Sequence, residues 1–162
     1  MRSSKYEIVW KVMYTWMEKF LESGFYEKLG DYEKFFASFV IAPFIDGMVD
    51  EARLLPEEWN EENISYFFLV TMPNGSGAAL DFPIHQTRVM EAFFLYLDDR
   101  SVIKNGARLA KKIRSLESGI IEAMTNSKFG QMARKKFPVA KINIEDFKDA
   151  NGNVNRPRMI SF

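Results

Sequence analysis

The spacing of apolar and polar residues predicts helices along most of the chain. From residue 4 onward, apolar side chains recur every three or four positions, the period of a helix with one buried face. Ser4 and Glu7 have the S-x-x-E spacing of a capping box, which marks a helix start, and Gly24 is the predicted stop. The apolar positions of this first helix are Tyr6, Val9, Trp10, Met13, Trp16, Met17, Phe20 and Leu21.

A second helix is predicted from Asp31, which we expect to act as its N-cap. Its apolar face continues past Pro43 to about Leu54. Proline has no backbone N–H to donate and clashes with the preceding turn. The chain is therefore expected either to kink at Pro43 or to begin a new helix with Pro43 in its first turn.

Residues 64–72 are rich in β-branched and aromatic side chains and precede a glycine-containing turn. This order is compatible with a β-hairpin that has a longer loop. It is equally compatible with a helix from Asn60 or Asn63 to Thr71, ended by Pro73. Periodicity does not separate the two in so short a run, and the helical neighbours favour the helix.

Two flanking segments have clearer patterns. Residues 56–63 are acidic and are expected to be exposed, apart from Trp59. Residues 81–99 are expected to form a helix with Pro83 in its first turn. The predicted buried face of that helix consists of Val89, Phe93, Phe94 and Leu97.

The strongest amphipathic pattern lies in residues 101–124, where we predict one continuous helix capped by Ser101. At 100° per residue, aliphatic and basic side chains fall on opposite sides. Arg100 extends the basic side if the helix begins earlier, and Arg114 lies at its flank. The aliphatic side consists of Val102, Leu109, Ile113, Leu116, Ile120 and Met124, and the basic side of Lys104, Arg108, Lys111 and Lys112.

The C-terminal part changes character. A short basic helix is predicted over 128–137, and the alternation in 138–147 indicates a short strand. Residues 148–162 are rich in turn formers and are expected to form a mobile arm, whose apolar end pairs back as a ribbon or docks on a neighbouring subunit. The predicted fold is an all-α bundle of five to seven helices in a single domain over 1–147, with a small β-hairpin or C-terminal ribbon as an addition.

Composition narrows the class of protein. The 162 residues are 47% apolar and contain no Cys and a single His. Disulfides, thiolate nucleophiles and two-histidine metal sites within one chain are therefore excluded. The longest nearly apolar run, residues 35–45, is too short to cross a bilayer. We expect a cytoplasmic protein with no membrane partner and no cofactor.

The charge is unevenly distributed although the net charge is zero. Residues 1–99 carry 8 Lys+Arg against 17 Asp+Glu, a net charge of −9. Residues 100–136 carry 10 Lys+Arg against 2 Glu, a net charge of +8. Such asymmetry bears on the choice of partner and not on the fold.

The basic segment supplies the candidate binding residues. Several cations on one side of a rigid helix suit a phosphate backbone, because neutralised phosphates release counterions. An acidic protein surface, including that of another copy, and a plain solvated face are the alternatives. No sequence-specific nucleic-acid motif is recognisable. The candidate residues are Arg100, Lys104, Arg108, Lys111, Lys112, Arg114, Lys128, Arg134, Lys135 and Lys136.

The oppositely charged parts suggest two further functions. Subunits could join head to tail through opposite charges and the C-terminal arm, forming a homo-oligomer. The acidic part could instead meet a basic partner, as in an interaction module of the immunity, inhibitor or adaptor type. In either case the protein is a binding or assembly protein and not an enzyme.

A magnesium-dependent all-α hydrolase is the third hypothesis. Residues 57–61 have the E-E-x-x-E spacing with which all-α nucleotide pyrophosphatases hold Mg²⁺. The second pair of carboxylates that such a site needs is missing, because Asp81 is the one acidic residue in 63–90. The candidate metal ligands are Asp46, Asp50, Glu58 and Glu61. His85, with Asp81 four residues earlier, is the one candidate imidazole base, and no nucleophile accompanies it.

Overall fold

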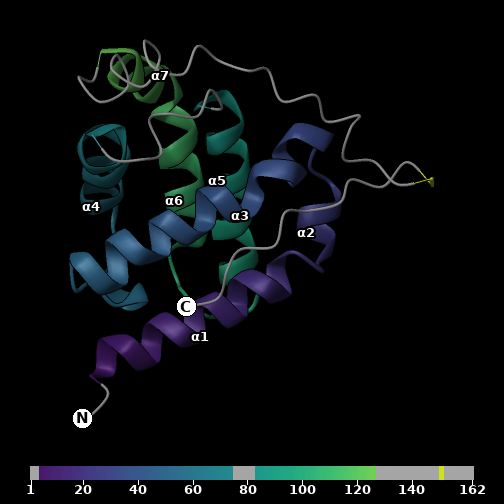
Figure 1. Cartoon of the computed structure of the whole chain (residues 1–162). Helices are drawn as coiled ribbons and strands as arrows, with labels where there is room; N and C mark the ends of the chain where they lie inside the picture. The colour runs from purple at the N-terminus through teal and green to yellow at the C-terminus, as the bar shows by residue number, and fades with distance from the viewer. Residues whose placement is uncertain (1–3, 75–82, 127–149, 152–162) are drawn as a thin grey trace.

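The computed structural model describes residues 4–74, 83–126 and 150–151, and 81% of these residues are helical. Within those ranges there are seven α-helices and no strand, so the predicted all-α helical bundle is confirmed (Figure 1). The predicted elements over 128–137 and 138–147 and almost all of the arm lie outside the described residues. The α-helices are α1 (Lys5–Phe20), α2 (Gly24–Glu27), α3 (Asp31–Ile45), α4 (Glu61–Tyr66), α5 (Pro83–Asp99), α6 (Gly106–Ser115) and α7 (Glu117–Asn126).

The start of α1 is confirmed and its end is earlier than expected. The Ser4 hydroxyl accepts a hydrogen bond from the Glu7 backbone N–H at 3.2 Å. The helix ends at Phe20, and Gly24 begins α2 instead of stopping α1. Ser23 causes the difference, because its hydroxyl donates to the Phe20 carbonyl and accepts from the N–H of Tyr26, the capping bond that starts α2.

The helix α3 passes through Pro43 without ending. Its N-cap is Gly30, and the expected cap, Asp31, is its first residue. The prediction of a new helix with Pro43 in its first turn is wrong. Pro43 removes one hydrogen bond from the helical ladder, and three residues later the backbone widens into a π-helical segment, η1 (Asp46–Glu51).

Residues 61–74 are helical, so the hairpin alternative is wrong for this described part. A 3₁₀ turn, η2 (Pro56–Glu58), precedes α4. Asn60 and Asn63 cap α4 reciprocally, because each side chain accepts from the other's backbone N–H at 2.9 Å. After α4 comes a second π-helical segment, η3 (Phe67–Thr71), and then a 3₁₀ turn, η4 (Met72–Asn74).

The predicted single helix over 101–124 is wrong, because the chain turns before α6 and again at Leu116. Ser101 does not cap α6. Its backbone is left-handed, with φ 58°, and it ends α5 in a Schellman motif: its N–H donates to Asp98 O, and the Val102 N–H donates to Leu97 O. The Asp98 carboxylate caps α6 instead, accepting from the Ala107 N–H at 3.1 Å.

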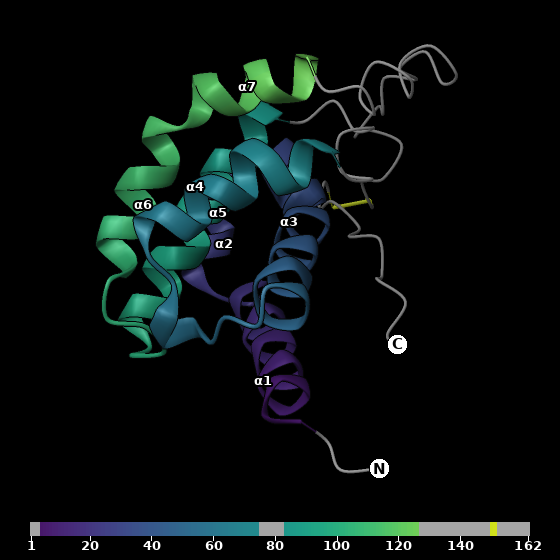
Figure 2. The same cartoon turned by 90° about the vertical axis from the view of Figure 1, so that its left-hand side faces the viewer.

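The central helix of the bundle is α5, which contacts α1, α2, α3, α6 and α7. In Figure 2, α6 and α7 form the outer edge on one side, and α1 lies at the opposite end from α7. The predicted face of α5 is fully buried. Phe44 of α3 stacks on Phe68 of η3 at a centroid distance of 5.6 Å and meets Phe94 of α5 edge-on at 5.5 Å.

Candidate functional site

The basic strip comprises Arg100, Lys104, Arg108, Lys111, Lys112 and Arg114, the described members of the predicted set. Arg100 and Lys104 lie in the connection between α5 and α6, and not on a helix as expected. The other four belong to α6, whose Leu109 and Ile113 are fully buried as predicted. Lys128, Arg134, Lys135 and Lys136 lie outside the described residues.

Carboxylates from neighbouring helices reach into the basic strip. Arg108 Nε lies 3.7 Å from Glu61 Oε1 of α4, and Arg114 Nε lies 3.1 Å from Glu91 Oε2 of α5. Arg100 pairs with the adjacent Asp99 at 3.8 Å. The side chains of Arg108 and Arg114 remain 73% and 75% exposed. Such exposed pairs contribute about 0–1 kcal/mol, so they do not lock the guanidinium groups in place.

The lysines of the basic strip differ from its arginines. Lys104, Lys111 and Lys112 form no ion pair with any residue in the described part of the chain. Lys104 and Lys111 are exposed, and Lys112 is half-buried. The strip therefore presents three uncompensated ammonium groups beside three weakly paired guanidinium groups.

The four candidate metal ligands have separate structural roles. Asp50 pairs with Arg53 at 4.0 Å, and Glu58 accepts from the Leu55 N–H at 2.8 Å. Glu61 belongs to the ion pair with α6. No cluster of three or more potential metal-binding side chains lies within residues 4–74 and 83–126.

Asp46, the fourth of these carboxylates, joins η1 to α1 through side-chain hydrogen bonds. Its Oδ1 accepts from Trp10 Nε1 at 2.7 Å and from the Tyr14 hydroxyl at 2.8 Å. Burial raises the pKa of Tyr14, and the hydrogen bond to Asp46 and the charge of its carboxylate raise it further. The carboxylate is therefore an anchor between two helical segments.

His85 lies in a polar cluster that the sequence did not reveal. Its Nδ1 is 3.6 Å from Oε2 of Glu33, and its ring stacks on Tyr32 at 5.2 Å. Arg88 donates to Glu33 Oε1 at 3.1 Å. Burial would raise the pKa of Glu33, but a backbone hydrogen bond, Arg88 and His85 together hold it below its ordinary value. Asp81, the predicted partner of His85, lies outside the described residues.

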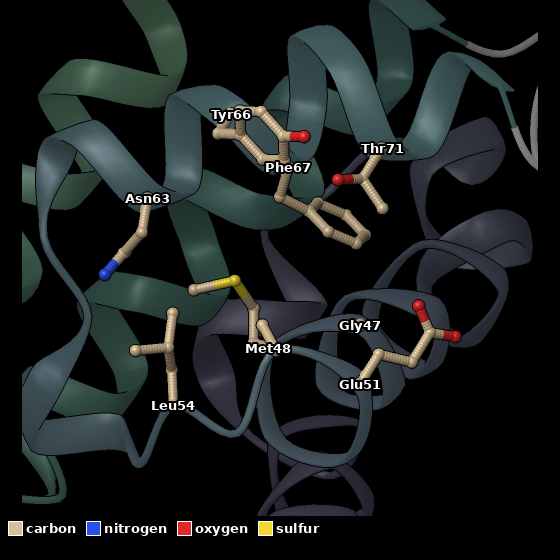
Figure 3. Close-up of a pocket in the computed structure, with 9 residues that line it drawn as sticks. Gly47, Met48, Glu51, Leu54, Asn63, Tyr66, Phe67 and Thr71 are labelled. Carbon is tan, nitrogen blue, oxygen red and sulfur yellow. The ribbon is translucent and has the colours of Figure 1, made fainter.

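A second candidate site is a cavity of about 250 Å³ between the two π-helical segments (Figure 3). Each segment contains the wide hydrogen bond of a π-turn: Ala52 N–H donates to Gly47 O, and Met72 N–H donates to Phe67 O. Such turns often occur at functional sites. The lining residues are Gly47, Met48, Glu51, Ala52, Leu54, Asn63, Tyr66, Phe67 and Thr71.

Gly47 allows the two segments to approach. A Cβ atom at this position would lie 2.3 Å from Cε2 of Phe67, closer than side chains tolerate. The Phe67 ring points toward Gly47 (Figure 3). No sequence motif marked this site, and the irregularity expected at Pro43 was the one local signal near it.

Comparisons with protein-family models, curated proteins and solved structures found no match to this chain. Within the described ranges, none of the helices combines the length and the apolar character needed to cross a membrane.

Proposed function

We propose that this chain is a non-catalytic binding protein that contacts a nucleic-acid backbone through the basic strip. The observation that carries the proposal is the set of three lysines, Lys104, Lys111 and Lys112, without a carboxylate partner in the described part of the chain. Uncompensated ammonium groups on α6 and on the turn before it attract phosphates, and the phosphates release their counterions on contact.

The placement of the arginines supports the same partner. Arg108, Lys111 and Arg114 follow at intervals of three residues, so consecutive cations are neighbours on the surface of α6. The two guanidinium groups are three-quarters exposed, and phosphate can bind them with paired hydrogen bonds. Binding to an acidic surface of a second copy would exchange Glu61 and Glu91 for other carboxylates as partners of these arginines. The gain in binding free energy would therefore be smaller than with phosphate.

The expected binding is independent of nucleotide sequence and strongly dependent on salt. The test is fluorescence anisotropy of a labelled DNA duplex titrated with protein at several salt concentrations. The triple variant Lys104→Gln, Lys111→Gln, Lys112→Gln removes three phosphate contacts. The slope of log K against log salt should then fall in magnitude by about 2.7, at roughly 0.9 per phosphate.

A matched control separates the strip from net charge. Lys5→Gln, Lys11→Gln, Lys28→Gln makes the same change in net charge at exposed lysines outside α6 and should leave the slope nearly unchanged. Equal slopes for wild type and the strip variant would refute the proposal. Absence of duplex binding, together with light scattering that rises at low salt, would favour assembly with the acidic surface of another copy.

A further inference from the structure

The cavity between η1 and η3 has a chemistry that selects a class of ligand. We propose that it binds a small aromatic ammonium compound, with the ring inside the cavity and the cationic head at its mouth near Glu51. This site is separate from the basic strip, and the inference does not depend on the proposed nucleic-acid function.

The charge of the lining favours a cation. Among the described residues that line the cavity, Glu51 alone is charged, and it forms no ion pair in that part of the chain. Arg53, a cation two residues away, is directed elsewhere, because it pairs with Asp50 and lies over the ring of Tyr6 at 5.2 Å. The Glu51 carboxylate is therefore left to attract a cation and to repel an anion.

The interior favours an apolar ring. Met48, Leu54 and Phe67 supply apolar side chains, and Tyr66 adds a ring that is 62% exposed (Figure 3). An ammonium group held near the Tyr66 face would also gain a cation–π contact, worth about 0.5–1 kcal/mol at an exposed site.

Two polar side chains of the lining, Asn63 and Thr71, have different roles. The Asn63 amide accepts from Asn60 N–H and donates to Glu58 O at 3.0 Å, and these two bonds hold it in the wall of the cavity. The hydroxyl of Thr71 forms no hydrogen bond within the described part of the chain and can accept from an ammonium head.

The size limits the ligand. About 250 Å³ lies just below the roughly 300–1,000 Å³ of pockets for drug-sized molecules, so the cavity suits one ring with a short chain. The close contact of Gly47 with Phe67 sets the separation of the two walls. We expect a fused polycyclic ligand to exceed this volume.

The test compares three molecules of similar shape and different charge: phenethylammonium, 2-phenylethanol and phenylacetate. Each is titrated into the full chain and followed by amide chemical shifts. Phenethylammonium should shift residues of η1 and η3 and bind about tenfold more tightly than phenylacetate, with the alcohol between them. Absence of binding at millimolar concentration, or equal binding of all three, would overturn the proposal.

Variants locate the binding. Glu51→Gln should reduce the affinity for phenethylammonium about three- to tenfold, whereas Glu57→Gln, an exposed carboxylate outside the lining, should not. Equal losses from both would indicate general attraction to an acidic surface and would contradict the proposal. Ala52→Phe fills the mouth from an exposed position and should abolish binding; unchanged affinity in this variant would place the ligand elsewhere.

Discussion

Gly106, the first residue of α6, packs directly against α5. A Cβ atom there would lie 2.4 Å from the Phe94 carbonyl oxygen and 2.4 Å from Cβ of Asp98. Non-bonded carbons attract at about 3.5–4.0 Å, so Gly106→Ala requires α6 to move by about 1 Å. A backbone carbonyl in the middle of α5 cannot rotate away as a flexible side chain would.

The expected cost follows from three contributions. Overpacking of this kind costs about 1–3 kcal/mol. Displacing the Ala107 N–H from its cap, Asp98, costs about 1 kcal/mol more, and the higher helix propensity of alanine returns at most about 1 kcal/mol. We expect Gly106→Ala to lower the free energy of unfolding by about 1–4 kcal/mol.

Gly24 provides the matched control, because it is also the first residue of a helix and a Cβ there meets nothing within 4 Å. Gly24→Ala should therefore be neutral or stabilising by up to about 1 kcal/mol. Urea unfolding followed by circular dichroism measures both variants. If Gly106→Ala proved as stable as Gly24→Ala, the close contact between α5 and α6 would be refuted.

Three further predictions concern carboxylates and their partners. Asp46→Ala leaves the Trp10 and Tyr14 donors without their acceptor and should lower the free energy of unfolding by about 2–4 kcal/mol in urea titrations; no loss would contradict the anchoring role. Folding raises the pKa of Tyr14, so its contribution to the free energy of unfolding is complete below the ordinary pKa of 10.0 and is lost as the pH rises above that value. Tyr14→Phe should therefore flatten the alkaline end of a plot of stability against pH measured to pH 11.5. Folding lowers the pKa of Glu33, so its contribution to the free energy of unfolding is present above the ordinary pKa of 4.5 and is lost as the pH falls. Glu33→Gln should therefore flatten the acid end of the same plot. An acid slope equal to that of wild type would exclude this carboxylate as the source of the pH dependence.

Helices whose ends are set by nearby residues were predictable. Ser4 caps α1 within three residues, and Pro83 begins α5 where its missing N–H costs nothing. The turn between α5 and α6 was not predictable in this way. It depends on the approach of Gly106 to Phe94 and on the Asp98 carboxylate reaching Ala107. The Asn105–Gly106 pair is a local turn signal within the amphipathic pattern, but it does not indicate either contact with α5.

The candidate sites also differ in how far the sequence alone could predict them. The cations of α6 were visible in the sequence, but their pairing with Glu61 and Glu91 depends on how α4 and α5 pack beside it. Glu33 could have been recognised, since it shares a helical face with Ala37 and Ile41, which are both fully buried. The cavity could not, because its two walls come from separate segments that only the packing of the bundle brings together.

Two tryptophan indole groups form hydrogen bonds at the two ends of η1, one wall of the cavity, so their fluorescence should report on this wall. Trp10 donates its indole N–H to Asp46, where η1 begins, and Trp59 donates to the carbonyl of Leu54, just beyond its end. Indole emission responds to the groups that its N–H contacts, so a molecule that enters the cavity and shifts η1 should change the intrinsic fluorescence. Trp16 packs against Tyr96 on another side of α1 and should contribute a constant background to the emission, so no added label is needed to follow this region of the bundle.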